Sequence, residues 1–74
     1  MPNEKKALAA LGKQIKAARK AKGLTQEQLA ELCDFDPTYV SLLECGRRNP
    51  PFTTLYKIAS SLKFPMKRLF EDVE

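Results

Sequence analysis

The chain has 74 residues, enough for one small domain whose hydrophobic core supplies only about 3–5 kcal/mol of stability. It contains two cysteines and no histidine, which excludes a structural zinc site with four nitrogen or sulfur ligands, and Cys33 and Cys45 are expected to be reduced thiols. No apolar run is long enough for a signal peptide or a membrane span, so we expect a cytoplasmic protein that binds no metal, no cofactor and no membrane.

Positive and negative charges occupy different parts of the sequence, although the net charge is only +4. Residues 1–23 contain seven basic residues and one acidic residue, whereas residues 24–45 contain five acidic residues and no basic one. Two further basic residues follow at Arg47 and Arg48. A protein that binds a polyanion needs a local basic surface more than a large total charge, so these clusters are candidates for nucleic-acid binding. The alternative is that the lysines only form the solvated face of a helix.

Apolar periodicity predicts a first helix that ends at Gly23, because glycine readily leaves the helical conformation. Its buried face is predicted from apolar residues at helical spacing, which are Leu8, Leu11, Ile15 and Ala18. The second helix is predicted to begin at Thr25, since the Thr25 hydroxyl and the Gln28 side chain have the spacing of a capping box. We expect the apolar residues of this helix to be buried: Leu29, Ala30, Leu32 and Cys33.

The third helix has the clearest predicted start, because Asp36 is a strong N-cap and Pro37 suits the first helical position. Gly46 is expected to end it. Only two residues separate this helix from the second, so the two should cross steeply as a helix-turn-helix at about residues 25–45. One face of the third helix carries residues at i, i+3, i+4 and i+7: Thr38, Ser41, Leu42 and Cys45.

The C-terminal part of the chain completes the predicted fold. A rigid loop at residues 49–51 precedes a fourth helix, which is expected to end at Phe64 and Pro65. A short fifth helix is predicted at residues 66–70, and the acidic end after it is expected to fray. The fold class predicted for residues 1–74 is therefore all-α, with five helices in a single domain.

The C-terminal part contains more large apolar side chains than one edge of a small domain needs for its own packing. They are Phe52, Phe64, Met66, Leu69 and Phe70. Small domains are often stabilised by a second copy of the same chain, and most homodimers are two-fold symmetric. We therefore predict that these residues form the interface of a homodimer.

The sequence resembles the lambda-repressor-like (Xre/Cro-type) helix-turn-helix family. Residues 24–32, LTQEQLAEL, resemble the opening of the motif, and residues 36–50, DPTYVSLLECGRRNP, resemble its recognition helix and the loop that follows. Residues 55–62 also fit the family, so the likeness covers about residues 8–70.

A narrower resemblance and two departures concern the motif itself. TYVS at residues 38–41 and GRRN at residues 46–49 are similar to the controller proteins of restriction–modification systems. Those proteins often carry arginine where this chain has Pro37, which removes one candidate for guanine recognition. The family usually has glycine at the turn, where this chain has Asp34, a residue that tolerates the left-handed conformation better than most.

The resemblance implies a sequence-specific regulator of transcription that binds a double-stranded DNA operator as a homodimer, with the third helix (about residues 37–45) in the major groove. It implies base recognition by five residues: Pro37, Thr38, Tyr39, Ser41 and Leu42. It implies contacts to the DNA backbone from five others: Lys22, Thr25, Gln26, Arg47 and Arg48. It also pairs Arg19 with Glu44 as a structural ion pair between the first and third helices.

Several alternatives stay open at this stage. Tyr39 either contacts DNA through its phenol or braces the turn, and Leu42 either contacts a thymine methyl or adds to the core. The function is alternatively that of an antitoxin with a protein toxin as partner, or of a protein-interaction module that does not bind DNA. An enzyme is not expected, because the sequence offers no histidine, no nucleophile with a neighbouring base and no phosphate-binding loop.

Overall fold

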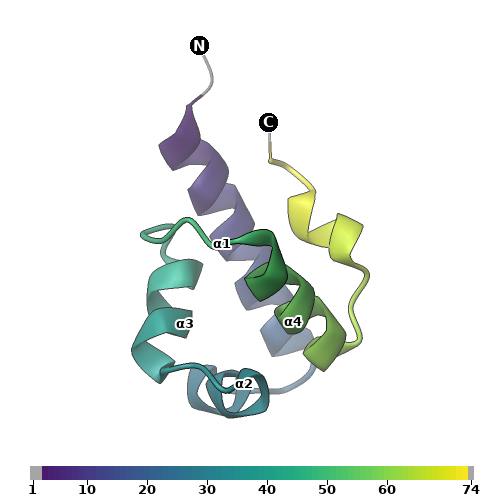
Figure 1. Ribbon diagram of the computed structural model, residues 1–74. Coiled ribbons are helices and arrows are strands. Elements are labelled where there is room, and N and C mark those ends of the chain that lie inside the picture. The colour runs from purple at the N-terminus through teal and green to yellow at the C-terminus, as the bar shows by residue number, and fades with distance from the viewer. Residues whose placement is uncertain (1–2, 74) are drawn as a thin grey trace.

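The computed structural model describes residues 3–73, and this part of the chain contains helices and no strand (Figure 1). There are four α-helices, α1 (Glu4–Ala21), α2 (Gln26–Cys33), α3 (Pro37–Glu44) and α4 (Phe52–Leu62), and one 3-10 helix, η1 (Met66–Phe70). The all-α class is as predicted, but the fifth element is not an α-helix. Its backbone bonds span three residues, as in the 3.0 Å bond from Arg68 N–H to the Pro65 carbonyl, which is typical of very short segments.

The helices enclose one hydrophobic core that draws side chains from every element. In Figure 1, α1 runs behind α4, with α3 on one side and η1 on the other, while α2 closes the lower end. The largest fully buried side chains come from all five elements: Ile15, Leu29, Cys33, Val40, Ile58 and Leu69. None of the helices within residues 3–73 combines the length and apolar character that crossing a membrane requires.

The predicted caps position α2 and α3. Thr25 Oγ1 accepts a 3.0 Å bond from Gln28 N–H, and the Gln28 side chain accepts a 2.9 Å bond from Thr25 N–H, so the capping box is confirmed. Asp36 Oδ1 accepts a 2.7 Å bond from Thr38 N–H at the start of α3. Between the two helices, Asp34 adopts the left-handed conformation (φ 57°, ψ 44°), as expected for the residue at the family's usual glycine position.

Two close backbone approaches fix α3 and its following loop against α1. A Cβ at Gly12 would lie 2.6 Å from the carbonyl oxygens of both Leu43 and Glu44, so only glycine allows the two helices to come this near. Gly46 has φ +73°, and a Cβ there would lie 2.9 Å from the backbone of Ala9. The orientation of α3 therefore depends on glycine at both contacts.

Two expectations about exposure are wrong. Leu32 was expected in the core, but it is 55% exposed, because the buried face of α2 is formed by Leu29, Ala30 and Cys33 and Leu32 lies outside it. The acidic end, residues 71–74, was expected to fray, and of these Glu74 lies outside the described residues. Within the described residues it returns to α1, where Gln14 Nε2 donates a 3.2 Å bond to the Glu71 carbonyl and Val73 packs against the core.

Candidate nucleic-acid interface

One side of α3 is packed against the domain and the other side is open. Val40 and Leu43 are buried in the core, as their spacing requires. On the opposite side Thr38 is exposed, while Ser41 and Leu42 are partly exposed. The open side therefore presents two hydroxyls and one branched apolar side chain, and no charged group.

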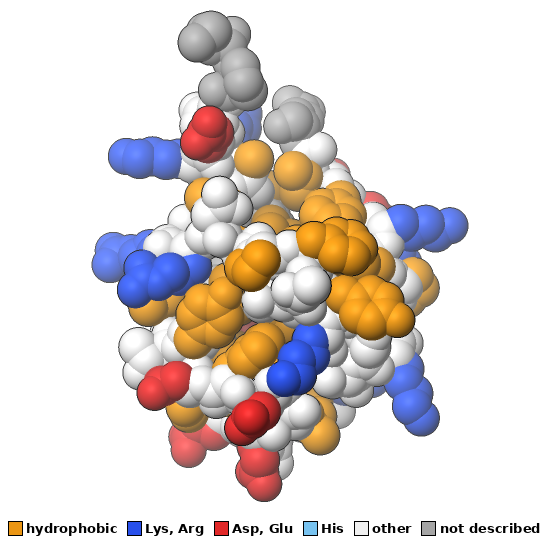
Figure 2. Space-filling model, in the orientation of Figure 1, with side chains coloured by type: hydrophobic (Ala, Val, Ile, Leu, Met, Phe, Trp, Pro, Cys, Tyr) orange, Lys and Arg blue, Asp and Glu red, His pale blue; other side chains and the backbone are white. Residues whose placement is uncertain are grey.

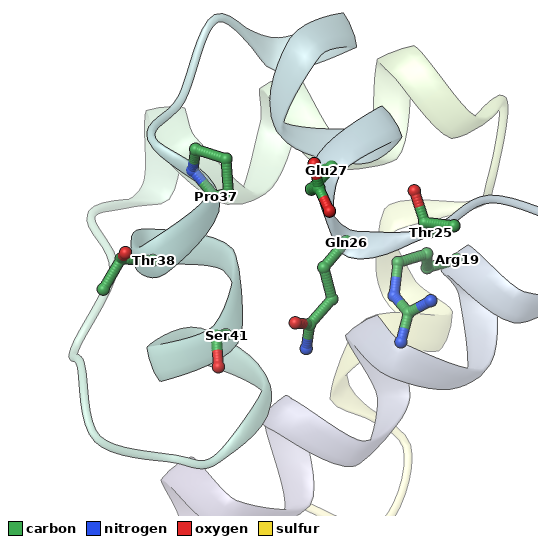
Figure 3. A pocket seen from close by; sticks show the side chains of 7 residues that line it. All are labelled: Arg19, Thr25, Gln26, Glu27, Pro37, Thr38 and Ser41. Carbon is green, nitrogen blue, oxygen red and sulfur yellow. The ribbon is translucent and has the colours of Figure 1, made fainter.

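An open cleft lies between the N-terminal ends of α2 and α3 (Figure 3). Its lining residues come from three helices: Arg19, Thr25, Gln26, Glu27, Pro37, Thr38 and Ser41. The N-terminal end of α2 directs its first backbone N–H groups and the positive end of its dipole toward this region, which favours an anionic ligand. The start of α3 adds no free N–H group, because Pro37 has none and Thr38 N–H is already bonded to Asp36. The structure thus brings together five residues that the sequence assigned to DNA contact. Glu27 was missed, and the only signal for it is its place beside Gln26.

A buried hydrogen-bond network lies beneath this cleft and joins α1, α2 and α3. Arg19 donates to both carboxylate oxygens of Glu44, from Nε at 2.7 Å and from a terminal nitrogen at 3.0 Å, and its other terminal nitrogen donates to the Leu24 carbonyl at 2.7 Å. The ion pair implied by the resemblance is therefore present. Hydrogen bonding to Glu44 raises the pKa of Arg19, and this effect outweighs the lowering caused by burial.

Gln26 links this network to the cleft. Its Nε2 donates a 3.1 Å bond to Glu44 Oε1, the oxygen that also accepts from Arg19. A side-chain amide has two N–H donors, so this bond orients the group and leaves a second donor for a ligand. The ion pair thereby positions a residue of the cleft as well as holding α3 against α1.

The cationic residues expected at the DNA backbone lie in different places. Arg47 and Arg48 are exposed in the loop after α3, at the end of the helix far from the first cleft. Lys22 caps the C-terminal end of α1 and lines neither the cleft between α2 and α3 nor a second cleft, which the loop after α3 forms with the start of α1. The structure therefore brings the two arginines together and leaves Lys22 apart.

The comparison with known protein families agrees with this geometry. Residues 15–69, about three quarters of the chain, match the family model described as Helix-turn-helix (HTH_3). The chain belongs to this helix-turn-helix family. It is thereby placed among the helix-turn-helix regulators of transcription.

Relatives of this helix-turn-helix chain include several controller proteins. The control protein C.MunI of Mycoplasma sp is 41% identical over 64 residues, which cover 85% of this chain and 86% of C.MunI. The crystal structure of the restriction-modification controller protein C.AhdI from Aeromonas hydrophila has a TM-score of 0.82 at 38% identity, over 85% of this chain and 96% of that one. The tetramer of the controller C.Esp1396I in complex with its natural 35 base-pair operator gives a TM-score of 0.78 at 34% identity, over 90% and 88% of the two chains.

Tyr39 and Leu42, whose roles the sequence left open, differ in their surroundings. The Tyr39 ring packs partly buried against the core and meets Phe35 edge to face, with 5.4 Å between centroids, which favours the bracing role. Among the described residues, Leu42 is not one of the apolar side chains packed against the core. This helix-turn-helix therefore leaves Leu42 available on the outer side of α3.

A separate apolar surface lies over α4 and η1, where Figure 2 shows hydrophobic side chains gathered on the face. Phe52 and Phe70 are 66% and 42% exposed. Tyr56, which sequence reasoning missed although it follows Phe52 by one helical turn, is 60% exposed and stacks on Phe52 at 6.4 Å between ring centroids. We call Phe52, Tyr56 and Phe70 the aromatic surface.

The remaining residues of the predicted dimer interface are less available. Leu69 is 0% exposed and belongs to the core of the single chain, so its assignment to the interface is wrong. In η1, Leu69 faces inward toward α1 and α4 while Phe70, the next residue, faces outward. Phe64 and Met66 are partly buried against the same core.

Proposed function

We propose that this chain is a sequence-specific regulator of transcription that binds double-stranded DNA as a homodimer and inserts α3 into the major groove. The observation that carries the proposal is the cleft in which the N-terminal ends of α2 and α3 meet beside the open side of α3. The similarity to a controller solved with its operator DNA supports the same function. We propose the cytoplasm as its place of action.

Base recognition on this proposal is performed by Thr38, Ser41 and Leu42. The hydroxyls can donate to or accept from base edges in the major groove, and Leu42 suits a thymine methyl group. Pro37 lies at the same end of α3 and adds an apolar contact without a hydrogen bond. Residues 37–45 contain no lysine or arginine, so discrimination between sequences rests on these short side chains.

Backbone contacts would come from the groups around α3. Gln26, oriented by Glu44, is placed to donate to a phosphate at the start of α2, where the helix N-terminus also attracts the anion. Thr25 contributes less, because its hydroxyl already caps α2. Arg47 and Arg48 would bind the DNA backbone at the far end of α3, and Lys22 would act only at longer range.

The aromatic surface is proposed as the homodimer contact. Two copies joined there would present two α3 helices to half-sites about 34–36 Å apart, one turn of DNA. We expect sedimentation at micromolar concentration to show a dimer, and Tyr56→Ser to weaken it. Leu32→Ser removes a side chain of similar exposure on α2 (55% against 60%) and should leave the dimer unchanged. A monomer under all conditions, with and without DNA, would contradict the dimer.

Selection of bound duplexes from a random DNA pool tests the function most directly. We expect enrichment of one short motif with two-fold symmetry. Failure to enrich or retain any duplex at low salt would contradict the proposal and favour a protein-interaction module. Copurification with a protein toxin would instead favour the antitoxin role.

A further inference from the structure

A second cleft lies at the C-terminal end of α3, opposite the cleft that contains Gln26. Its lining residues come from the start of α1 and from the loop after α3: Lys5, Leu8, Ala9, Cys45, Gly46, Arg47, Arg48 and Asn49. Three of these side chains are positively charged, and all three are exposed. Within residues 3–73, no carboxylate lies within ion-pair distance of any of them. The cleft therefore concentrates positive charge that forms no ion pair within the described residues, although the Arg48 guanidinium donates a 3.2 Å bond to the Arg47 carbonyl.

The backbone explains why residues so distant in sequence share this cleft. Gly46 adopts φ +73° and lies directly on the backbone of α1, where an added Cβ would be 2.9 Å from Ala9 Cα and Ala9 N. This contact holds the loop against the first part of α1, so that Lys5 lines the same cleft as Arg47 and Arg48. Sequence reasoning missed Lys5, because nothing local indicates the contact.

The two clefts stand at opposite ends of α3. With eight residues, α3 is about 12 Å long, which is close to the width of the DNA major groove. A helix placed in that groove would therefore have one of these two clefts at each end, each within reach of the sugar–phosphate backbone. In Figure 2, basic side chains (blue) project from the side of the molecule on which the loop after α3 lies.

We propose that Lys5, Arg47 and Arg48 together form a clamp for a backbone phosphate of the bound DNA, at the end of α3 far from α2. This proposal rests on the proposed function and extends it, since it adds Lys5 to the DNA-binding residues and assigns it to the same phosphate site as the loop arginines. An arginine presents paired N–H donors to a phosphate and lysine adds a compact charge, so the three side chains suit one tetrahedral anion.

The test compares Lys5→Ala with Lys6→Ala. The two variants lose the same charge from adjacent positions of α1, but Lys6 does not line the cleft. Binding of each variant and of the unchanged protein to a random-sequence duplex is titrated at several salt concentrations. We expect Lys5→Ala to flatten the dependence of log K on log salt concentration by about one unit, because one phosphate contact is lost, and Lys6→Ala to leave the slope unchanged.

A second comparison asks whether Lys5 shares its site with the loop. Once Arg47 and Arg48 are both replaced by alanine, the added Lys5→Ala change should have little further effect on the slope. Equal slopes for the Lys5 and Lys6 variants, or a full further loss in the combined variant, would overturn the clamp. If the unchanged protein binds no duplex at low salt, the proposed function itself fails, which is a separate result.

Discussion

Removing Glu44 should destabilise the domain more than any change on its surface. The Glu44 side chain is 2% exposed and its partner Arg19 is 9% exposed, and Glu44 accepts three hydrogen bonds, two from Arg19 and one from Gln26. Truncating one member of a buried pair leaves the other charge unpaired, which costs about 3–5 kcal/mol. Because a core of this size supplies only about 3–5 kcal/mol, Glu44→Ala should lie near the edge of stability.

A double-mutant cycle, measured by thermal and urea unfolding, gives the coupling free energy between Arg19 and Glu44 apart from the other contacts of each side chain. We expect Arg19→Ala and Glu44→Ala each to lower the melting temperature strongly, and the double variant to lose clearly less than the sum. Glu71→Ala is the matched control, since its ion pair with Arg68 is 3.4 Å long, about half exposed, and worth about 0–1 kcal/mol. Additive losses in the cycle would refute the coupling.

The pKa shift of Arg19 predicts how its contribution to folding stability changes with pH. Because the pKa of Arg19 is raised in the folded state, its charged form stabilises the fold at every pH below the ordinary arginine range. That contribution is lost only as the pH rises through the raised pKa of Arg19, above the ordinary arginine range. Stability should therefore show no step from Arg19 between pH 7 and about 10.

Three smaller predictions concern the backbone, all measured by urea unfolding. Gly12→Ala should cost about 1–3 kcal/mol of unfolding free energy despite the higher helix propensity of alanine, because its Cβ would meet two α3 carbonyl oxygens at 2.6 Å. Gly23→Ala is the control and should cost less, since there is open space around Gly23, although its φ is +71°. The reverse order of the two losses would contradict the close approach of α1 and α3. Asp34→Gly should raise stability by up to about 1 kcal/mol, since φ is 57° there, and a loss would show that the side chain has another role. Asp36→Ala should cost about 1 kcal/mol as the bond to Thr38 N–H is lost, and no change would mean that the cap is not used.

The sequence predicted the features that depend on neighbours along the chain. The capping box at Thr25, the Asp36 cap and the left-handed Asp34 are each specified within a few residues, and all three are present. The Arg19–Glu44 pair spans 25 residues, so it came from the family resemblance and not from local pattern.

Features that depend on tertiary contacts were not predictable in this way. In a short 3-10 segment, apolarity does not show which of Leu69 and Phe70 faces the core, and both had been assigned to the surface. Exposure of Leu32 likewise depends on how α2 is rotated against its neighbours. The meeting of Lys5 with the loop follows from the Gly46–Ala9 contact, which joins two segments with no shared local signal.

The central claim is that α3 recognises sequence while the groups beside it bind the DNA backbone. Titrations of Thr38→Ala and Arg47→Ala on the selected operator and on random duplex, at several salt concentrations, test it. Thr38→Ala should weaken operator binding by about 1–3 kcal/mol and leave random DNA almost unaffected. Arg47→Ala should weaken both DNAs and flatten the salt dependence by about one unit. If Thr38→Ala weakens both DNAs equally while Arg47→Ala affects only the operator, the assignment of the two roles is contradicted.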